Sequence, residues 1–143
     1  MIHYSAGLLF DNEKEHVALI HKNRGPDINI GKWTAIGGKE EADEGMYQCQ
    51  LREFHEETGL RVVDWDDFLQ VTGKGYIVFF YRAFVPLDQL AQIETMEDEK
   101  VTFFHIHQLQ YLPLARNLEW IIPVALDEHI LDVRVIDDLN IQL

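Results

Sequence analysis

Three glutamates in one predicted helix are the residues best suited to chemistry. Glu53, Glu56 and Glu57 stand at positions i, i+3 and i+4, and this spacing places their carboxylates on one helical face. Their mutual repulsion is relieved by a hard cation, and oxygen-only ligands favour Mg2+, Mn2+ or Ca2+ over zinc or copper. A solvated acidic face is the plainer interpretation of three glutamates alone, so the neighbouring residues decide between the two.

The neighbouring residues extend the pattern over 38–60. Gly38 is followed after five residues by Glu44, and after seven more by the run REFHEETGL at 52–60. This pattern resembles the Nudix box at every defined position. Weaker similarity to the MutT-type purine nucleotide pyrophosphohydrolases covers 31–39 (GKWTAIGGK) and 98–126. The resemblance implies an α/β Nudix fold, a mixed β-sheet between α-helices, in a single Nudix domain over 1–143.

The resemblance also implies how the box works. The carbonyl of Gly37 joins Glu53, Glu56 and Glu57 around the cation, which is Mg2+, with Mn2+ as the alternative. Arg52 keeps its charge at any ordinary pH. It is therefore suited to hold a neighbouring carboxylate, Glu44 or Glu53, by a charge-assisted hydrogen bond.

A carboxylate must accept the proton of the attacking water. Glu53 is the first choice because it lies in the box. Glu99 is the second, since Nudix hydrolases often bring a glutamate to the metals from the loop before a late strand. Asp98 and Glu97 compete with Glu99 for this role.

The substrate-binding candidates are cations and one amide. Lys39, together with Lys22 and Arg24 in the preceding loop, can neutralise phosphate oxygens, although each can also be an ordinary surface cation. Asn117 stands where MutT-like enzymes place a base-reading side chain, and its amide offers both a donor and an acceptor. A simple helix N-cap is an equally good interpretation of Asn117.

The expected activity is Mg2+-dependent pyrophosphohydrolysis of nucleoside triphosphates or related nucleoside diphosphate derivatives. Hydrolysis of dinucleoside polyphosphates, ADP-ribose or nucleotide sugars stays open. Tyr76 lies near a tyrosine position of dinucleoside polyphosphate hydrolases, but it also fits a packed strand. A non-catalytic nucleotide-sensing Nudix module would usually have a damaged box, and an isoprenoid diphosphate isomerase would need further catalytic residues that the sequence does not reveal.

Composition narrows the partners and the compartment. The net charge of −13 opposes binding to the phosphate backbone of long nucleic acids. A single cysteine, Cys49, excludes an internal disulfide and suits a reducing compartment, so a cytoplasmic location is expected. No stretch approaches the roughly 20 apolar residues that span a bilayer. A small nucleotide-like substrate is the expected partner, and a homodimer stays open.

Hydrophobic periodicity predicts the elements that position these residues. The helix that carries the glutamates should run over 43–58 and end at Gly59, and a second helix should occupy 117–130, with Pro123 as an awkward interior residue. An acidic loop is expected over 86–100, and the tail 131–143 alternates too weakly for an assignment. Strands are predicted at 2–10, 16–21, 33–36, 61–72, 76–85 and 101–106.

Overall fold

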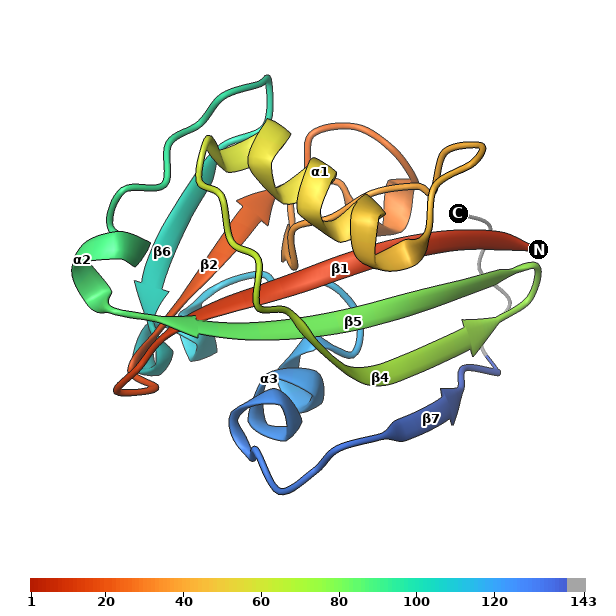
Figure 1. Ribbon diagram of the computed structural model, residues 1–143. Helices are drawn as coiled ribbons and strands as arrows, with labels where there is room; N and C mark the ends of the chain where they lie inside the picture. The colour runs from red at the N-terminus through yellow and green to blue at the C-terminus, as the bar shows by residue number, and fades with distance from the viewer. Residues whose placement is uncertain (139–143) are drawn as a thin grey trace.

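The computed structural model describes residues 1–138, whose frame is a seven-stranded mixed sheet (Figure 1). The strand order is β3-β2-β1-β5-β4-β7, and β6 pairs with β2. β1 and β5 run parallel along their whole lengths at the centre, from the Ile2–Tyr76 pair to the Asp11–Val85 pair. The strands are β1 (Ile2–Asp11), β2 (His16–His21), β3 (Trp33–Thr34), β4 (Asp66–Gly73), β5 (Tyr76–Val85), β6 (Val101–His105) and β7 (Val133–Ile136).

Both faces of the sheet are covered by helices. α1 (Met46–Thr58) lies over one face, and α3 (Leu118–Leu126) lies over the other (Figure 1). Alternation along β1 sends Leu8 and Phe10 to the core beneath α3, and Leu9 to the core beneath α1. The expected arrangement of a mixed sheet between helices is confirmed. Shorter elements are α2 (Leu87–Leu90) and 3-10 turns at Asp27–Asn29 and Ile106–Tyr111.

The helix of the box ends where the sequence predicts. Gly59 adopts a left-handed conformation, with φ of 74°, and its N–H donates to the carbonyl of His55. The helix begins at Met46 rather than at Asp43, because Asp43 lies in a turn with φ of 63°. The Phe54 side chain is fully buried and packs edge-on against Trp65, which fixes the helix on the sheet.

Two predicted strands are longer than those observed. The strand expected over 61–72 begins only at Asp66. Trp65 donates through its indole N–H to the Val62 carbonyl, so the segment before β4 folds beneath α1 instead of extending the sheet. The strand expected over 33–36 is reduced to the two residues of β3, and Ile36 forms an isolated bridge with Gly7.

The second helix ends before the predicted limit at residue 130. α3 begins at Leu118 and contains Pro123, but it stops at Leu126. The buried Arg82 guanidinium donates to the carbonyls of Ala125, Asp127 and Ile130. These bonds satisfy carbonyls at the end of the helix and turn the chain toward β7.

The tail contributes the edge strand β7, which pairs in parallel with β4. The prediction for 131–143 had left this segment unassigned, and residues 139–143 lie outside the described part of the chain. None of the helices within residues 1–138 has the length and apolar character needed to cross a membrane.

Candidate active site

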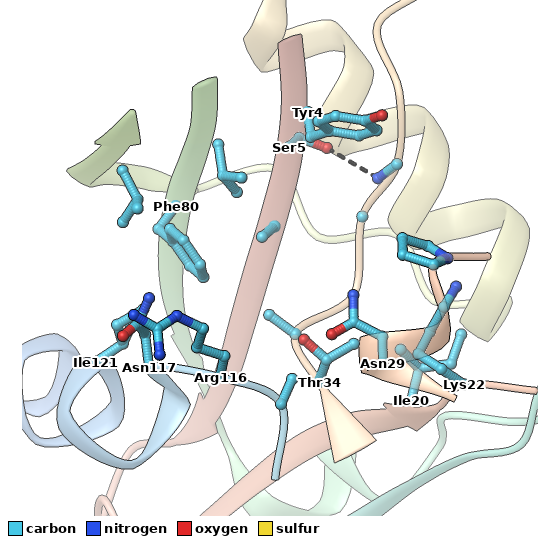
Figure 2. Close-up of a pocket in the computed structure, with 18 of the residues that line it drawn as sticks. Tyr4, Ser5, Ile20, Lys22, Asn29, Thr34, Phe80, Arg116, Asn117 and Ile121 are labelled. Atoms are coloured by element: carbon cyan, nitrogen blue, oxygen red, sulfur yellow. Dashed lines mark hydrogen bonds between the residues drawn. The ribbon is translucent and has the colours of Figure 1, made fainter. Parts of the chain in front are cut away.

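A pocket of about 290 Å³ joins the Nudix-box segment to the amino end of α3. One end is formed by Gly37, Gly38, Lys39 and Glu57, and the other by Arg116 and Asn117. Apolar side chains of β4, β5 and α3 line the wall between the ends: Val71, Val78, Phe80 and Ile121. Figure 2 shows Phe80 beside Ile121, Arg116 and Asn117, with Lys22 and Thr34 across the cavity. The pocket thus has a polar end at the box, an apolar middle and a polar far end.

The two glycines at the box end are required by close approach. A Cβ at Gly37 would stand 2.1 Å from the Ser5 carbonyl oxygen of β1, and a Cβ at Gly38 would stand 2.4 Å from the Glu53 carboxyl carbon. The Gly38 carbonyl accepts from the Ser5 N–H at 2.8 Å, and the Gly38 N–H lies 3.4 Å from the Ser5 hydroxyl (Figure 2). The carboxylate of Glu53 therefore lies directly against the backbone of this segment.

Arg52 holds the carboxylates of the box by a forked set of bonds. Its Nε and Nη2 donate to Glu44 at 2.7 and 3.0 Å, and its Nη1 donates to Glu53 at 2.9 Å and to Glu56 at 3.2 Å. The hydrogen bonds from Arg52 hold the pKa of Glu44 down at about 2. Arg52 was expected to hold Glu44 or Glu53; it contacts both, and Glu56 is a further partner.

Glu57 is a buried carboxylate of the site whose pKa is strongly raised. It is 8% exposed, it lines the pocket, and its Oε2 is buried without a hydrogen-bond partner. Burial, followed by the negative charges of Glu97, Glu53 and Glu99, raises its pKa to about 7. Burial also raises the pKa of Glu53. A bound cation would stabilise the charged form of this buried carboxylate, which lies near other negative charges.

The segment 86–100, expected to be an acidic loop, includes the short helix α2, and the part after α2 is docked on the end of α1. The Glu94 and Met96 N–H groups donate to the carbonyls of Thr58 and Glu57. Glu99 is 1% exposed and accepts from the Lys22 ammonium and the Asn23 N–H, each at 2.8 Å. These bonds outweigh burial and lower its pKa.

Glu97 is the loop carboxylate whose charge acts on the site most directly. It contributes to the raised pKa values of both Glu53 and Glu57, whereas Glu99, which is paired with Lys22, contributes only to that of Glu57. Of these three successive acidic residues Glu99 is buried, whereas Glu97 and Asp98 are exposed.

The predicted phosphate-binding cations differ in their surroundings. Lys22 lines the pocket, but its ammonium is paired with Glu99. Arg24 is exposed and pairs with Asp98 at 3.2 Å. Lys39 lines the pocket at the box end and is exposed. Lys39 is therefore the cation that stands beside the box, and Arg24 lies outside the pocket lining.

Asn117 lies at the far end of the pocket, but its side chain does not cap the helix. Its backbone adopts φ of 72° at the N-cap position, and its carbonyl accepts from the Trp120 and Ile121 N–H groups. The amide oxygen accepts from the Trp120 indole at 3.0 Å, and the amide nitrogen donates to Asp137 at 3.0 Å. Asn117 therefore occupies the N-cap position, but its amide is directed to Asp137 and Trp120 rather than to the backbone N–H groups of the helix.

Asp137 is a site residue that sequence reasoning missed. It follows β7 and lines the pocket, with its side chain only 6% exposed. It accepts from Arg116 Nε and Nη2 at 3.1 and 3.0 Å, in addition to the Asn117 amide. No spacing or motif in the sequence connects residue 137 with residues 116 and 117, since only the pairing of β7 with β4 brings them together.

Tyr76 behaves as a packed strand residue. It is 6% exposed, and a Cβ at Gly73 on the paired strand would meet its ring at 2.2 Å. Burial, followed by the charge of Asp137, raises its pKa.

The residues at the box end suit a hard divalent cation, although they do not form a complete cage. Within residues 1–138, no three acidic, histidine or cysteine side chains are gathered closely enough to hold a metal. Arg52 draws Glu53 and Glu56 toward itself, while Glu57 faces the pocket. Mg2+ commonly uses one or two carboxylates, water and substrate phosphates rather than an all-protein cage, so the unpartnered Glu57 oxygen fits this cation.

Comparison with known proteins defines the family. Residues 1–124 match the model of the NUDIX domain. This match spans most of the chain and includes the whole box, so the protein belongs to the Nudix family.

Solved structures agree on the fold. The MutT protein of Bacillus halodurans superposes with a TM-score of 0.72 at 21% identity, covering 100% of this chain and 94% of that one. The MutT protein of Methanosarcina mazei Go1 gives a TM-score of 0.69 at 21% identity, covering 90% and 94%. The NUDIX domain of Shewanella oneidensis NrtR, solved in complex with ADP ribose, gives 0.64 at 18% identity, covering 86% and 84%. At these identities the likeness establishes a shared fold.

Proposed function

We propose that this protein is a Mg2+-dependent pyrophosphohydrolase of nucleoside triphosphates or related nucleoside diphosphate derivatives, acting as a single domain. The observation that carries the proposal is the buried, unpartnered carboxylate oxygen of Glu57 at the box end of the pocket. A cation there would bring phosphates to that end, and the apolar middle of the pocket would receive the nucleoside.

The chain's own residues have distinct parts in this proposal. Glu57 would hold the cation, joined by Glu53, Glu56 and the Gly37 carbonyl once these carboxylates draw closer together than they lie in this structure. Arg52 would orient Glu53 through the bond at 2.9 Å. Bound Mg2+ would supply neutralisation of the phosphate charge and activation of water.

Proton transfer and phosphate positioning fall to neighbouring side chains. Glu53 would accept the proton of the attacking water, because burial raises its pKa and a stronger base is the better acceptor near neutral pH. Glu99 is the second candidate, and Asp98 and Glu97 compete with it for this role. Lys39 would contact the phosphates, and Lys22 would do so if the substrate competes with Glu99 for its ammonium.

The size of the pocket favours one nucleoside over two. Its volume of about 290 Å³ lies just below the range of roughly 300–1,000 Å³ that is typical of small-molecule sites. Hydrolysis of ADP-ribose or a nucleotide sugar is the second candidate, supported by the ADP ribose bound to the structurally similar NrtR domain. The intact box argues against a sensing module without catalysis.

A hydrolysis screen tests this proposal. Nucleoside triphosphates, nucleotide sugars, ADP-ribose and dinucleoside polyphosphates are incubated with the protein and Mg2+, and the products are separated by chromatography. We expect turnover of at least one nucleoside triphosphate and its loss in excess chelator. Full turnover in chelator would contradict the metal requirement, and turnover of ADP-ribose alone would favour the second candidate.

A further inference from the structure

The far end of the pocket contains a buried charged network that the box chemistry does not use. Asp137 accepts two hydrogen bonds from Arg116 and another from Asn117, although 94% of its side chain is removed from solvent. A buried carboxylate destabilises the folded state unless hydrogen bonds from its partners replace those it made with water. Here a forked guanidinium and an amide provide that compensation.

The network determines which atoms face a ligand. Asp137 engages Nε and Nη2 of Arg116, so the Nη1 edge of the guanidinium is directed away from the carboxylate. The Trp120 indole N–H donates to the amide oxygen of Asn117, and this bond fixes which side of the amide carries the nitrogen. Both residues line the pocket opposite the box, as Figure 2 shows. The groups that remain for a ligand are therefore mainly N–H donors.

We propose that Asp137 is a positioning residue that holds Arg116 and Asn117 as hydrogen-bond donors, so that Arg116 selects nucleotides whose base presents a carbonyl oxygen at the far end of the pocket. This inference rests on the proposed function for the placement of the phosphates at the box. Neutralisation of Arg116 by Asp137 also reduces its attraction for a second phosphate, which suits a neutral base.

The expected preference follows from hydrogen-bond complementarity. Guanine and thymine present the O6 and O4 carbonyl oxygens where adenine and cytosine present amino groups. With adenine or cytosine, the amino group of the base would face the N–H donors of Arg116, so the hydrogen bond to the guanidinium would be lost. The loss of this bond corresponds to a difference in affinity of roughly tenfold or more.

Binding of triphosphate analogues with methylene-bridged phosphates tests the inference without hydrolysis. Calorimetry in the presence of Mg2+ should show the guanine and thymine analogues binding roughly tenfold more tightly than the adenine and cytosine analogues. In Asp137→Asn the amide has only one oxygen and cannot accept both hydrogen bonds from Arg116, so the ratio of the two affinities should fall toward one. Asp138→Asn is the matched control, because it removes the same charge from the exposed adjacent residue, and it should keep the wild-type ratio.

A second variant covers the case in which Asp137→Asn does not fold. Arg116→Lys keeps the charge of a side chain that is 42% exposed but loses the fork, so the ratio should fall while the melting temperature stays close to wild type. A wild-type ratio near one, or an unchanged ratio in the folded variants, overturns the inference while leaving hydrolysis intact. Selective binding by a wild-type protein that hydrolyses no nucleotide would instead overturn the proposed function alone.

Discussion

Replacement of Glu57 by glutamine removes a buried charge while keeping nearly the same shape. The raised pKa means that the folded protein holds the Glu57 proton more tightly than the unfolded chain does. Its contribution to stability is therefore complete below pH 4.5 and is lost as the pH rises to about 7. A shift from 4.5 to about 7 corresponds to about 3 kcal/mol at higher pH.

The variant recovers only part of that free energy. The glutamine amide would leave its own group unpartnered at the position of Oε2, which costs about 1–2 kcal/mol. We therefore expect metal-free Glu57→Gln to be more stable than wild type at pH 8 by about 1–2 kcal/mol, or roughly 2–8 °C in melting temperature. Below pH 4.5 the advantage should disappear, because Glu57 is protonated in both the folded and the unfolded states.

Thermal unfolding with chelator and with Mg2+ at several pH values provides the measurement. Mg2+ should raise the melting temperature of wild type, since it binds only the folded state, and should raise that of Glu57→Gln much less. Glu13→Gln is the control, because Glu13 is exposed and its replacement should change little. If metal-free Glu57→Gln is less stable than wild type at pH 8, the account of Glu57 as an uncompensated buried charge is refuted.

Two further substitutions test the geometry of the box. Gly38→Ala should lower kcat by about 100-fold or more, because the added Cβ would lie 2.4 Å from the Glu53 carboxyl carbon and would displace that carboxylate. Gly45→Ala is the control, since its Cβ meets open space, and it should leave turnover near wild type. Equal turnover of the two variants would contradict this reasoning. Arg52→Lys should reduce kcat/KM by about 10–100-fold and the free energy of unfolding by about 1–3 kcal/mol, because one ammonium cannot hold Glu44 and Glu53 together. Steady-state kinetics and thermal unfolding measure the two effects, and wild-type values in both would contradict this role of Arg52.

The local order of residues was sufficient to predict the frame and the box. Alternating apolar residues in 2–10 and 76–85 predict the central strands β1 and β5, because a strand buried on both faces needs apolar side chains on both. The recurrence of Tyr47, Leu51 and Phe54 at intervals of three and four, with Gly59 after them, predicts α1 and its end from local order as well. Arg52 could also be assigned to Glu44 and Glu53, since a helix and the short turn before it leave few other partners within reach.

Only the tertiary structure decided the remaining contacts, because they join segments that are far apart in the chain. The pairing of Lys22 with Glu99 brings two loops together, and no local pattern indicates that this glutamate is buried while Glu97 is exposed. Asp137 reaches Arg116 and Asn117 only because β7 pairs with β4. Backbone hydrogen bonding is nearly independent of sequence, so the amino acids alone could not show which strand the tail would join, nor that its aspartate would complete the far end of the pocket.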